Sequence, residues 1–291
     1  MTDSLIFTRA SLNAGTARER MLRASEEVSS GLAVVHPGDG PAAAGLAVLH
    51  GQSRVREDAI LQATGRASDE VGAADGALDG LGNLLSRARE LAVQLSNDSY
   101  SADERANAAS EIDGLFQSAI GLLNTQSGGR YLFGGSMDAT PPFDATGAYL
   151  GDVQVRSVEI APGQTQEVSI RADVMAKGTG GGADALATLQ ALSTALSAND
   201  AVGIRAALDP LDSSIKQVAT GRAQLGAASA ILGSATEIAR AARDAAKVAG
   251  AHEVEADAIE SMTRLAQAER ALDASLSSSA KSFKLTLLDK L

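Results

Sequence analysis

The apolar residues between Val71 and Leu95 are spaced so regularly that they constrain the fold more than any other part of the chain. They recur in alternating steps of three and four residues: Val71, Ala74, Leu78, Leu81, Leu85, Ala88, Ala92 and Leu95. On a helix this heptad repeat forms one narrow apolar stripe, roughly 37 Å long at ~1.5 Å per residue. Because a stripe of this kind is not stable in water, another helix must cover it. The pattern therefore favours a core helix of a bundle over a free two-stranded coiled coil.

The composition also favours long helices that pack side by side. The chain has 291 residues, no Cys, no Trp and only 3% aromatic residues, which is too few large rings for a thick globular core. Its net charge of −11 is spread along the chain, so we expect neither nucleic acid nor a membrane as a partner. No window reaches the ~18 consecutive apolar residues of a spanning helix. Residues 1–24 also lack the apolar segment of a signal peptide.

A first helix is expected over Met1–Ser30, although no single apolar stripe runs along it. Two heptad phases compete, one formed by Leu5, Leu12, Glu19 and Glu26 and the other by Met21, Val28 and Val35. A helix without a complete stripe gains little stability from one partner, so this helix needs partners on several sides. The prolines and glycines of residues 36–41 end it.

Two further helices are expected before the middle of the chain. The first resumes at Ala42 and runs to Leu95, with a loose patch near Gly51. Ser101, followed three residues later by Glu104, forms a capping box for the next helix. That helix is expected to end near residue 128 and to lie antiparallel to its predecessor, because the connection is short.

The middle of the chain interrupts the helical pattern. Gly134-Gly135 and Pro141-Pro142 exclude helix, and the alternation of apolar and polar residues over 153–170 has the period of a strand. With a turn at Pro162-Gly163, this alternation predicts a β-hairpin or small sheet with one covered face. The glycine-rich residues 178–182 predict a flexible hinge back to helix.

From Asp184 the sequence predicts helix to the end of the chain, beginning with a short amphipathic helix that is closed at Asn199-Asp200. The segment Ile204–Leu225 repeats the heptad spacing and is the natural cover for the Val71 stripe. Pro210 lies inside this segment, so a helix either begins or kinks there. Nearer the C-terminus, a half-polar seam is formed by Met262, Leu265, Glu269, Leu272, Leu276, Ser279 and Phe283.

These patterns predict a mainly α fold of long antiparallel helices with heptad packing, formed by the N- and C-terminal halves, plus a small β-rich insertion. We expect a terminal helical assembly region of residues 1–41 and 251–291, a bundle core of 42–135 and 183–250, and an outward β-rich domain of 136–182. The terminal helices have no settled stripe of their own, so we assign their large apolar residues to packing between subunits. This candidate assembly interface comprises Leu5, Leu12, Leu22, Leu265, Leu272, Leu276, Phe283, Leu287, Leu288 and Leu291.

The residues needed for catalysis or metal binding do not occur in productive patterns. His36, His50 and His252 lie far apart, and none has a second His or a carboxylate pair at the spacing of metal ligands. The chain has no Cys and no nucleophile-elbow motif, and the 178–182 glycines lack the Lys-Ser/Thr of a phosphate-binding loop. We therefore predict no catalytic, cofactor-binding or metal site and no cofactor.

Several motifs, taken in order, resemble the bacterial flagellins and their relatives. The N-terminal signature is carried by Glu27-Val-Ser-Ser-Gly-Leu32 and residues 37–45, and the following helix by Arg89-Glu-Leu-Ala-Val-Gln94. More selective is Gly129-Arg-Tyr-Leu-Phe-Gly-Gly-Ser136 with Thr140-Pro-Pro-Phe143, which is similar to the hook-filament junction family, the hook-associated proteins of type 3. Gly151-Asp152, residues 156–163 and the closing Leu287-Leu-Asp-Lys-Leu291 also resemble that family. Gly40 departs from it, since an Asp often stands there.

The resemblance implies an extracellular structural subunit of the flagellum, exported by the flagellar type III system without a cleaved signal. Its implied partners are copies of itself in a ring, the junction protein on the hook side, flagellin on the distal side, and an export chaperone that binds the C-terminal helix. Terminal helices that stay loose during export and order on assembly agree with this interpretation. A flagellin proper and an intracellular coiled-coil adaptor remain alternatives, and an enzyme is a more distant one.

Overall fold

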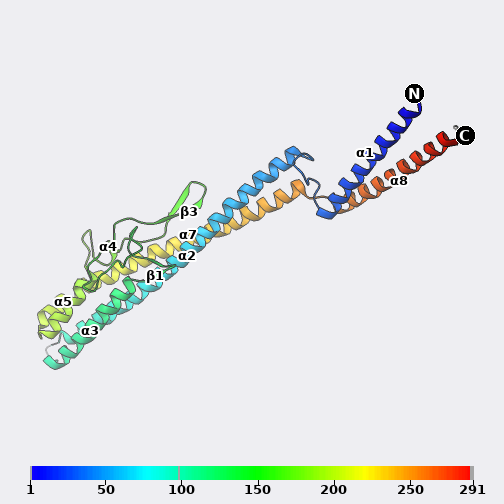
Figure 1. Ribbon diagram of the computed structural model, residues 1–291. Helices are drawn as coiled ribbons and strands as arrows, with labels where there is room; N and C mark the ends of the chain where they lie inside the picture. Colours follow the sequence, from blue (N-terminus) through cyan, green and yellow to red (C-terminus); the bar gives the residue numbers. More distant parts are fainter. Residues whose placement is uncertain (1, 98, 289–291) are drawn as a thin grey trace. The chain divides into compact units, whose positions relative to one another are not determined.

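The computed structural model describes residues 2–97 and 99–288, with the backbone alone for 2–7 and 282–288. Long helices dominate, and two small antiparallel sheets interrupt them (Figure 1). The helices are α1 (Thr2–Ser30), α2 (Pro41–Leu95), α3 (Ala102–Leu123), α4 (Ala172–Met175), α5 (Ala185–Ser197), α6 (Ala201–Ala206), α7 (Leu208–Val254) and α8 (Ala258–Leu288). The strands are β1 (Gln126–Ser127), β2 (Arg130–Tyr131), β3 (Ser157–Ala161) and β4 (Gln164–Glu167). The expected mainly α fold with a small β-rich insertion is confirmed.

The chain forms two compact units. One contains Met1–Glu57 together with Ala241–Leu291, and the other contains Asp58–Arg240. We call them the terminal unit and the central unit. Within the described residues, no helix is long and apolar enough to cross a membrane.

The core of the central unit is built on the heptad stripe of α2. All eight residues of the stripe are buried, with between 0% and 5% of their surface exposed. The facing helix is α7, which runs antiparallel to α2, as the Arg222 Nε–Asp75 Oδ1 ion pair of 2.9 Å and the 3.2 Å hydrogen bond from Thr236 to Thr64 require (Figure 1). The expectation that the second heptad segment covers the first agrees with these contacts.

Two charged side chains organise the connection from α2 to α3. Ser101 and Glu104 form the expected capping box, in which the Ser101 hydroxyl accepts from the Glu104 N–H and Glu104 accepts from the Ser101 N–H at 2.7 Å. Hydrogen bonds from the Ser101 N–H and hydroxyl lower the pKa of Glu104. Arg105 is buried and donates to the carbonyl oxygen of Leu95, the last residue of α2, at 3.0 Å and to that of Asn97, in the connection, at 2.9 Å. α3 then packs on α5.

The helix expected from Ala42 to Leu95 is confirmed, whereas the expected end of the next helix is wrong. α2 is continuous through Gly51, because one glycine inside a long packed helix costs only about 1 kcal/mol. α3 ends at Leu123 instead of near residue 128, because the Asn124 side chain turns away to donate to the Phe143 carbonyl oxygen at 2.8 Å.

The C-terminal half contains several helices, and the predicted end of the first of them at Asn199-Asp200 is confirmed. It is interrupted at Ala198–Asp200, at Ala207 and between Val254 and Ala258. Asn199 has a positive φ of 54°, which ends α5, and the side chain of Asp200 caps α6. Pro210 lies in the first turn of α7, where its missing N–H is not needed, so the helix begins there and does not kink.

The β-hairpin is present but shorter than its apolar alternation suggested. β3 and β4 pair antiparallel with a bulge between Glu159 and Ala161, and the turn at Pro162-Gly163 has Gly163 at φ 74° as expected. Val153 and Val155 lie outside the strands. The glycines at 178–182 form a hydrogen-bonded turn, with Gly182 N–H donating to Gly178 O at 2.9 Å, where a flexible hinge was predicted.

Candidate assembly surface

The terminal unit contains an antiparallel pair of helices, α1 and α8, whose bases are joined by backbone hydrogen bonds. Ala33 N–H donates to Val254 O at 2.8 Å, and Ala256 N–H donates to Gly31 O at 2.9 Å. Gly31 has a φ of 71°, so it can end α1 and turn the chain into this bridge without a steric penalty. These bonds place the end of α1 beside the start of α8, and the two helices pack against each other.

The seam between α1 and α8 consists mostly of small residues. The least exposed positions recur at heptad spacing on each helix: Ala10, Ala14, Ala17, Met21, Ala24 and Val28 on α1, and Ser261, Leu265, Ala268, Leu272, Ser275 and Ser279 on α8. Such a seam lets two helices approach closely but buries little apolar surface. The pair therefore draws little of its stability from its own contact.

The seam predicted on α8 is rotated by about one residue from the seam that packs on α1. Leu265, Leu272 and Ser279 belong to both. Met262, Glu269 and Leu276 of the predicted seam are exposed, and their small neighbours Ser261, Ala268 and Ser275 are the less exposed residues. Sequence reasoning selected the larger residues, because Ala and Ser give a weak apolar signal.

The candidate interface residues are only partly accounted for within one chain. Leu12, Leu22 and Leu276 expose 65%, 53% and 52% of their surface, and Leu265 and Leu272 are half-buried. Leu5, Phe283, Leu287 and Leu288 lie on helices whose side chains are not described there, and Leu291 lies outside the described residues. Their role between subunits stays a prediction.

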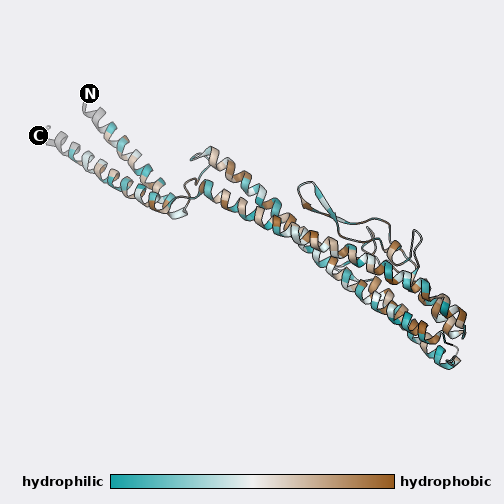
Figure 2. Ribbon diagram, turned by 180° about the vertical axis from the view of Figure 1, so that it is seen from behind, coloured by the Kyte–Doolittle hydropathy of each residue, from teal (hydrophilic) through white to brown (hydrophobic). Residues whose placement is uncertain are grey.

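A second group of exposed apolar residues was missed by the sequence reasoning. It comprises Leu46, Val48, Leu49 and Val55 on the first turns of α2, Val248 on α7, and Ile259 on α8. Each exposes between 44% and 80% of its surface. Figure 2 shows apolar residues along the terminal helices as well as in the bundle. The available signal was the cluster at residues 46–49, which we had attributed to the bundle core.

One charged residue of the seam is buried. Glu27 is 8% exposed, and its Oε1 lies 3.2 Å from Arg264 Nη2 on α8. Arg264 also lies 3.4 Å from Glu260, one turn earlier on its own helix. The heptad reading of α1 singled out Glu26, the adjacent residue, and missed Glu27.

In the central unit, the β-rich segment is attached to α2 by a second buried glutamate. Glu70 accepts from Arg130 Nη2 at 3.0 Å and also pairs with Arg156. The Glu70 side chain is only 9% exposed, and burial lowers the pKa of Arg156. Glu70 is 60 and 86 residues from its partners, so no local pattern could have predicted this attachment, which we call the Glu70 latch.

The glycine motif at 134–136 has a structural reason. Gly135 has a φ of 71° and lies against the Asp152 carboxylate, so a Cβ there would clash. Hydrogen bonds from the hydroxyl and N–H of Ser136 lower the pKa of Asp152. Tyr149 donates to the carbonyl oxygens of Phe133 and Asp152 at 3.1 and 2.8 Å, and burial raises its pKa to about 12. The motif therefore stabilises a turn.

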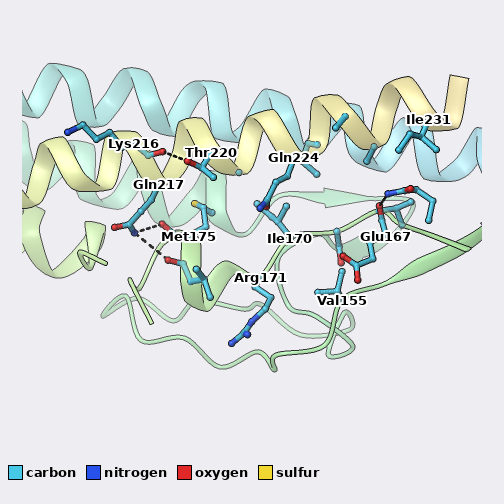
Figure 3. A pocket seen from close by; sticks show the side chains of 18 residues that line it. Val155, Glu167, Ile170, Arg171, Met175, Lys216, Gln217, Thr220, Gln224 and Ile231 are labelled. Atoms are coloured by element: carbon cyan, nitrogen blue, oxygen red, sulfur yellow. Dashed lines mark hydrogen bonds between the residues drawn. The ribbon is translucent and has the colours of Figure 1, made fainter. Parts of the chain in front are cut away.

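A groove of about 640 Å³ lies between α7 and the segment that follows β4 (Figure 3). Gln217 donates to the carbonyl oxygens of Met175 and Ala183 and accepts from the Ala183 N–H, so it clamps the glycine turn to α7. The lining contains neither Cys nor His. In the described part of the chain, no three His, Cys, Asp or Glu residues lie close enough together to hold a metal ion.

Comparison with known proteins identifies the family. Residues 6–138 match the bacterial flagellin N-terminal helical region. The flagellin of Listeria monocytogenes is 30% identical over 215 residues, which is 72% of this chain and 69% of that protein. Flagellar hook-associated protein 3 of Escherichia coli is 29% identical over 228 residues, which is 70% of this chain and 72% of that protein.

The solved structures agree on the fold. The crystal structure of flagellar hook-associated protein-3 from Legionella pneumophila superposes with a TM-score of 0.61 at 17% identity and covers 69% of this chain and 96% of that one. The predicted resemblance is confirmed: the chain belongs to the flagellin family of bacterial flagellar proteins and is similar, within that family, to the hook-associated proteins of type 3.

Proposed function

We propose that the protein is a structural subunit of the bacterial flagellum that joins the hook to the filament and assembles through its terminal helices. The proposal is carried by one observation. The seam between α1 and α8 consists mostly of Ala and Ser, while the large residues Leu12, Leu22 and Leu276 are exposed around it. Each such side chain contributes ~1.5–3 kcal/mol when buried. Neighbouring subunits supply the surfaces that bury them.

The proposed partners are those that the resemblance to the hook-associated proteins implies. Copies of this chain form a ring, with a hook-side junction protein on one side and flagellin on the other. The chain reaches this position outside the cell through the flagellar type III system, escorted by a chaperone bound to its C-terminal helix. The likeness to hook-associated protein 3 supports this place in the flagellum.

A flagellin proper is the second candidate, because the Listeria monocytogenes relative, whose alignment covers 72% of this chain, is a flagellin. The two functions differ in what is lost with the protein. Without a junction subunit, hooks stay bare and flagellin monomers are shed into the medium, since nothing adapts hook to filament. Without a flagellin, filaments are absent, short or altered and no excess of wild-type flagellin is shed.

Truncation after Ala271 tests this proposal, because it removes Leu272, Leu276 and the remaining C-terminal apolar residues. We expect bare hooks, measured by electron microscopy, and flagellin in the medium, measured by immunoblot. A matched pair of point variants sharpens the test. Leu276→Ser should weaken assembly, whereas Val202→Ser, at a residue of α6 that is 69% exposed, should not. Normal filaments and swimming in the truncated strain would refute both candidate functions. Retention of the full-length chain inside the cell would favour an adaptor.

A further inference from the structure

We propose that the ion pair between Glu27, which is buried, and Arg264, whose side chain is 47% exposed, helps to fix the register of α1 against α8. The register in turn determines where the exposed leucines of α1 lie relative to those of α8 along the helix axes. Only this consequence for assembly rests on the proposed function, since the register is a property of the terminal unit itself.

The seam by itself does not specify a register. Glu27 and Arg264 mark one level of the antiparallel pair. Ten residues earlier on α1 is Ala17, and eleven residues later on α8 is Ser275, so these two residues lie at about the same level. Sliding α8 by one heptad replaces Ser275 by Ala268 at this level. Both residues are small and both are little exposed, so the packing is nearly equivalent in the two registers.

The backbone bridge restricts the register at the base of the pair. It consists of the hydrogen bonds of Ala33 with Val254 and of Ala256 with Gly31, together with the pairing of Leu32 with Glu255. Every residue but proline offers the same backbone N–H and C=O groups. Even so, a slide by one heptad would replace Ala256 in this bridge by Ala249 of α7 or Thr263 of α8, and one of these helical segments would have to unwind. The bridge therefore acts on the register together with the ion pair.

Glu27 is different, because its charge is buried. Its Oε1 is inaccessible to solvent and forms the ion pair with Arg264 without a hydrogen bond among the described residues. A slide by one heptad would bring Asp257 or Ala271 opposite Glu27, which means a like charge or no charge at all. A buried carboxylate that loses its partner is strongly disfavoured, and polar groups in helical seams are best known for setting register.

Other charges near Glu27 do not substitute for Arg264. Arg23 lines the same cavity of about 510 Å³ as Glu27, one turn earlier on α1. Because it moves with Glu27 when the helices slide, it gives the same interaction in every register. Among the cavity-lining residues, the cation that α8 supplies is Arg264.

The chain has no Cys, so engineered cysteine pairs report the register without interference. One full-length version carries Ala17→Cys with Ser275→Cys, the observed register, and another carries Ala17→Cys with Ala268→Cys, the register shifted by one heptad. Mild oxidation is applied to intact flagella, and the intramolecular crosslink is measured by gel mobility. With the native ion pair, we expect the first version to crosslink and the second to stay reduced.

Arg264→Ala should lower the preference for the first pair over the second by at least about tenfold. Arg264→Lys, which keeps the charge, should retain most of the preference, and the exchange Glu27→Arg with Arg264→Glu should restore it. Arg270→Ala, at an exposed arginine of the same helix, serves as the control and should change nothing.

Each outcome is decisive. An unchanged preference in Arg264→Ala would overturn the proposal, and so would loss of both crosslinks, because the pair would then stabilise the hairpin without choosing its register. Failure of the charge exchange to restore the preference would overturn it as well. Absence of the native protein from flagella would refute the proposed function and not the register proposal. In that case the crosslinking preference is measured on the concentrated, purified full-length protein.

Discussion

Replacing Leu85 by Ala tests whether the heptad stripe holds the central unit together. Leu85 is completely buried and belongs to the cluster formed by the stripe, α3, α5 and α7. The substitution removes three carbon atoms, worth about 2.4 kcal/mol at ~0.8 kcal/mol each. The helices around the site leave little room to collapse, since α7 already approaches α2 so closely that a Cβ on Gly221 would lie 3.4 Å from Leu78. A residual cavity raises the expected loss to about 3–4 kcal/mol.

The assay is thermal unfolding of the purified chain followed by circular dichroism. A loss of about 3 kcal/mol lowers the melting temperature of a unit of this size by roughly 6–12 °C. Leu150→Ala is the matched control, because Leu150 lies in the same unit but is 53% exposed, and its substitution should cost less than ~0.5 kcal/mol. Equal shifts in the two variants would refute the assignment of the stripe to the core.

Four other expectations can be checked separately. Glu70→Ala leaves Arg130 and Arg156 without their shared counter-charge, so the stability loss should reach up to ~3 kcal/mol and limited proteolysis should cut within residues 130–160 faster than in the native chain. An unchanged cleavage rate would show that Glu70 does not hold this segment on α2. In dilute monomer, α1 and α8 should exchange their amide hydrogens far faster than residues 71–95, because their seam is built of small residues, and slow exchange in both helices would contradict this. Ser157→Cys, at an exposed position of β3, should react with a bulky maleimide on intact flagella if the β-rich segment faces outward, whereas poor labelling would place it between subunits. Burial raises the pKa of Tyr149 from 10.0 to about 12, so the stability it contributes is complete below pH 10 and is lost as the pH rises towards 12; phenolate absorbance should show one late-titrating tyrosine that Tyr149→Phe removes.

The sequence by itself determined the parts of the fold that depend on strong local contrast. The Leu-rich stripe of α2 was identified because large apolar residues at heptad spacing have no alternative use in a soluble chain. The capping box at Ser101 and the turn at Pro162-Gly163 were identified because their chemistry is confined to a few neighbouring residues. For the candidate site, the sequence pointed to large apolar residues on the terminal helices, of which Leu12, Leu22 and Leu276 are exposed, and their role between subunits stays a prediction.

The tertiary structure decided what each terminal helix turns towards its neighbour. In α8 the seam was predicted from the largest side chains, but the helix packs on α1 through Ser261, Ala268 and Ser275, one position away. Helices of Ala and Ser approach wherever close contact is possible, so side-chain size alone does not identify the contact face. The roles of Glu27 and Glu70 could not be predicted from local patterns, because each pairs with arginines at least 60 residues away in the sequence. Only the folded chain brings such charges together.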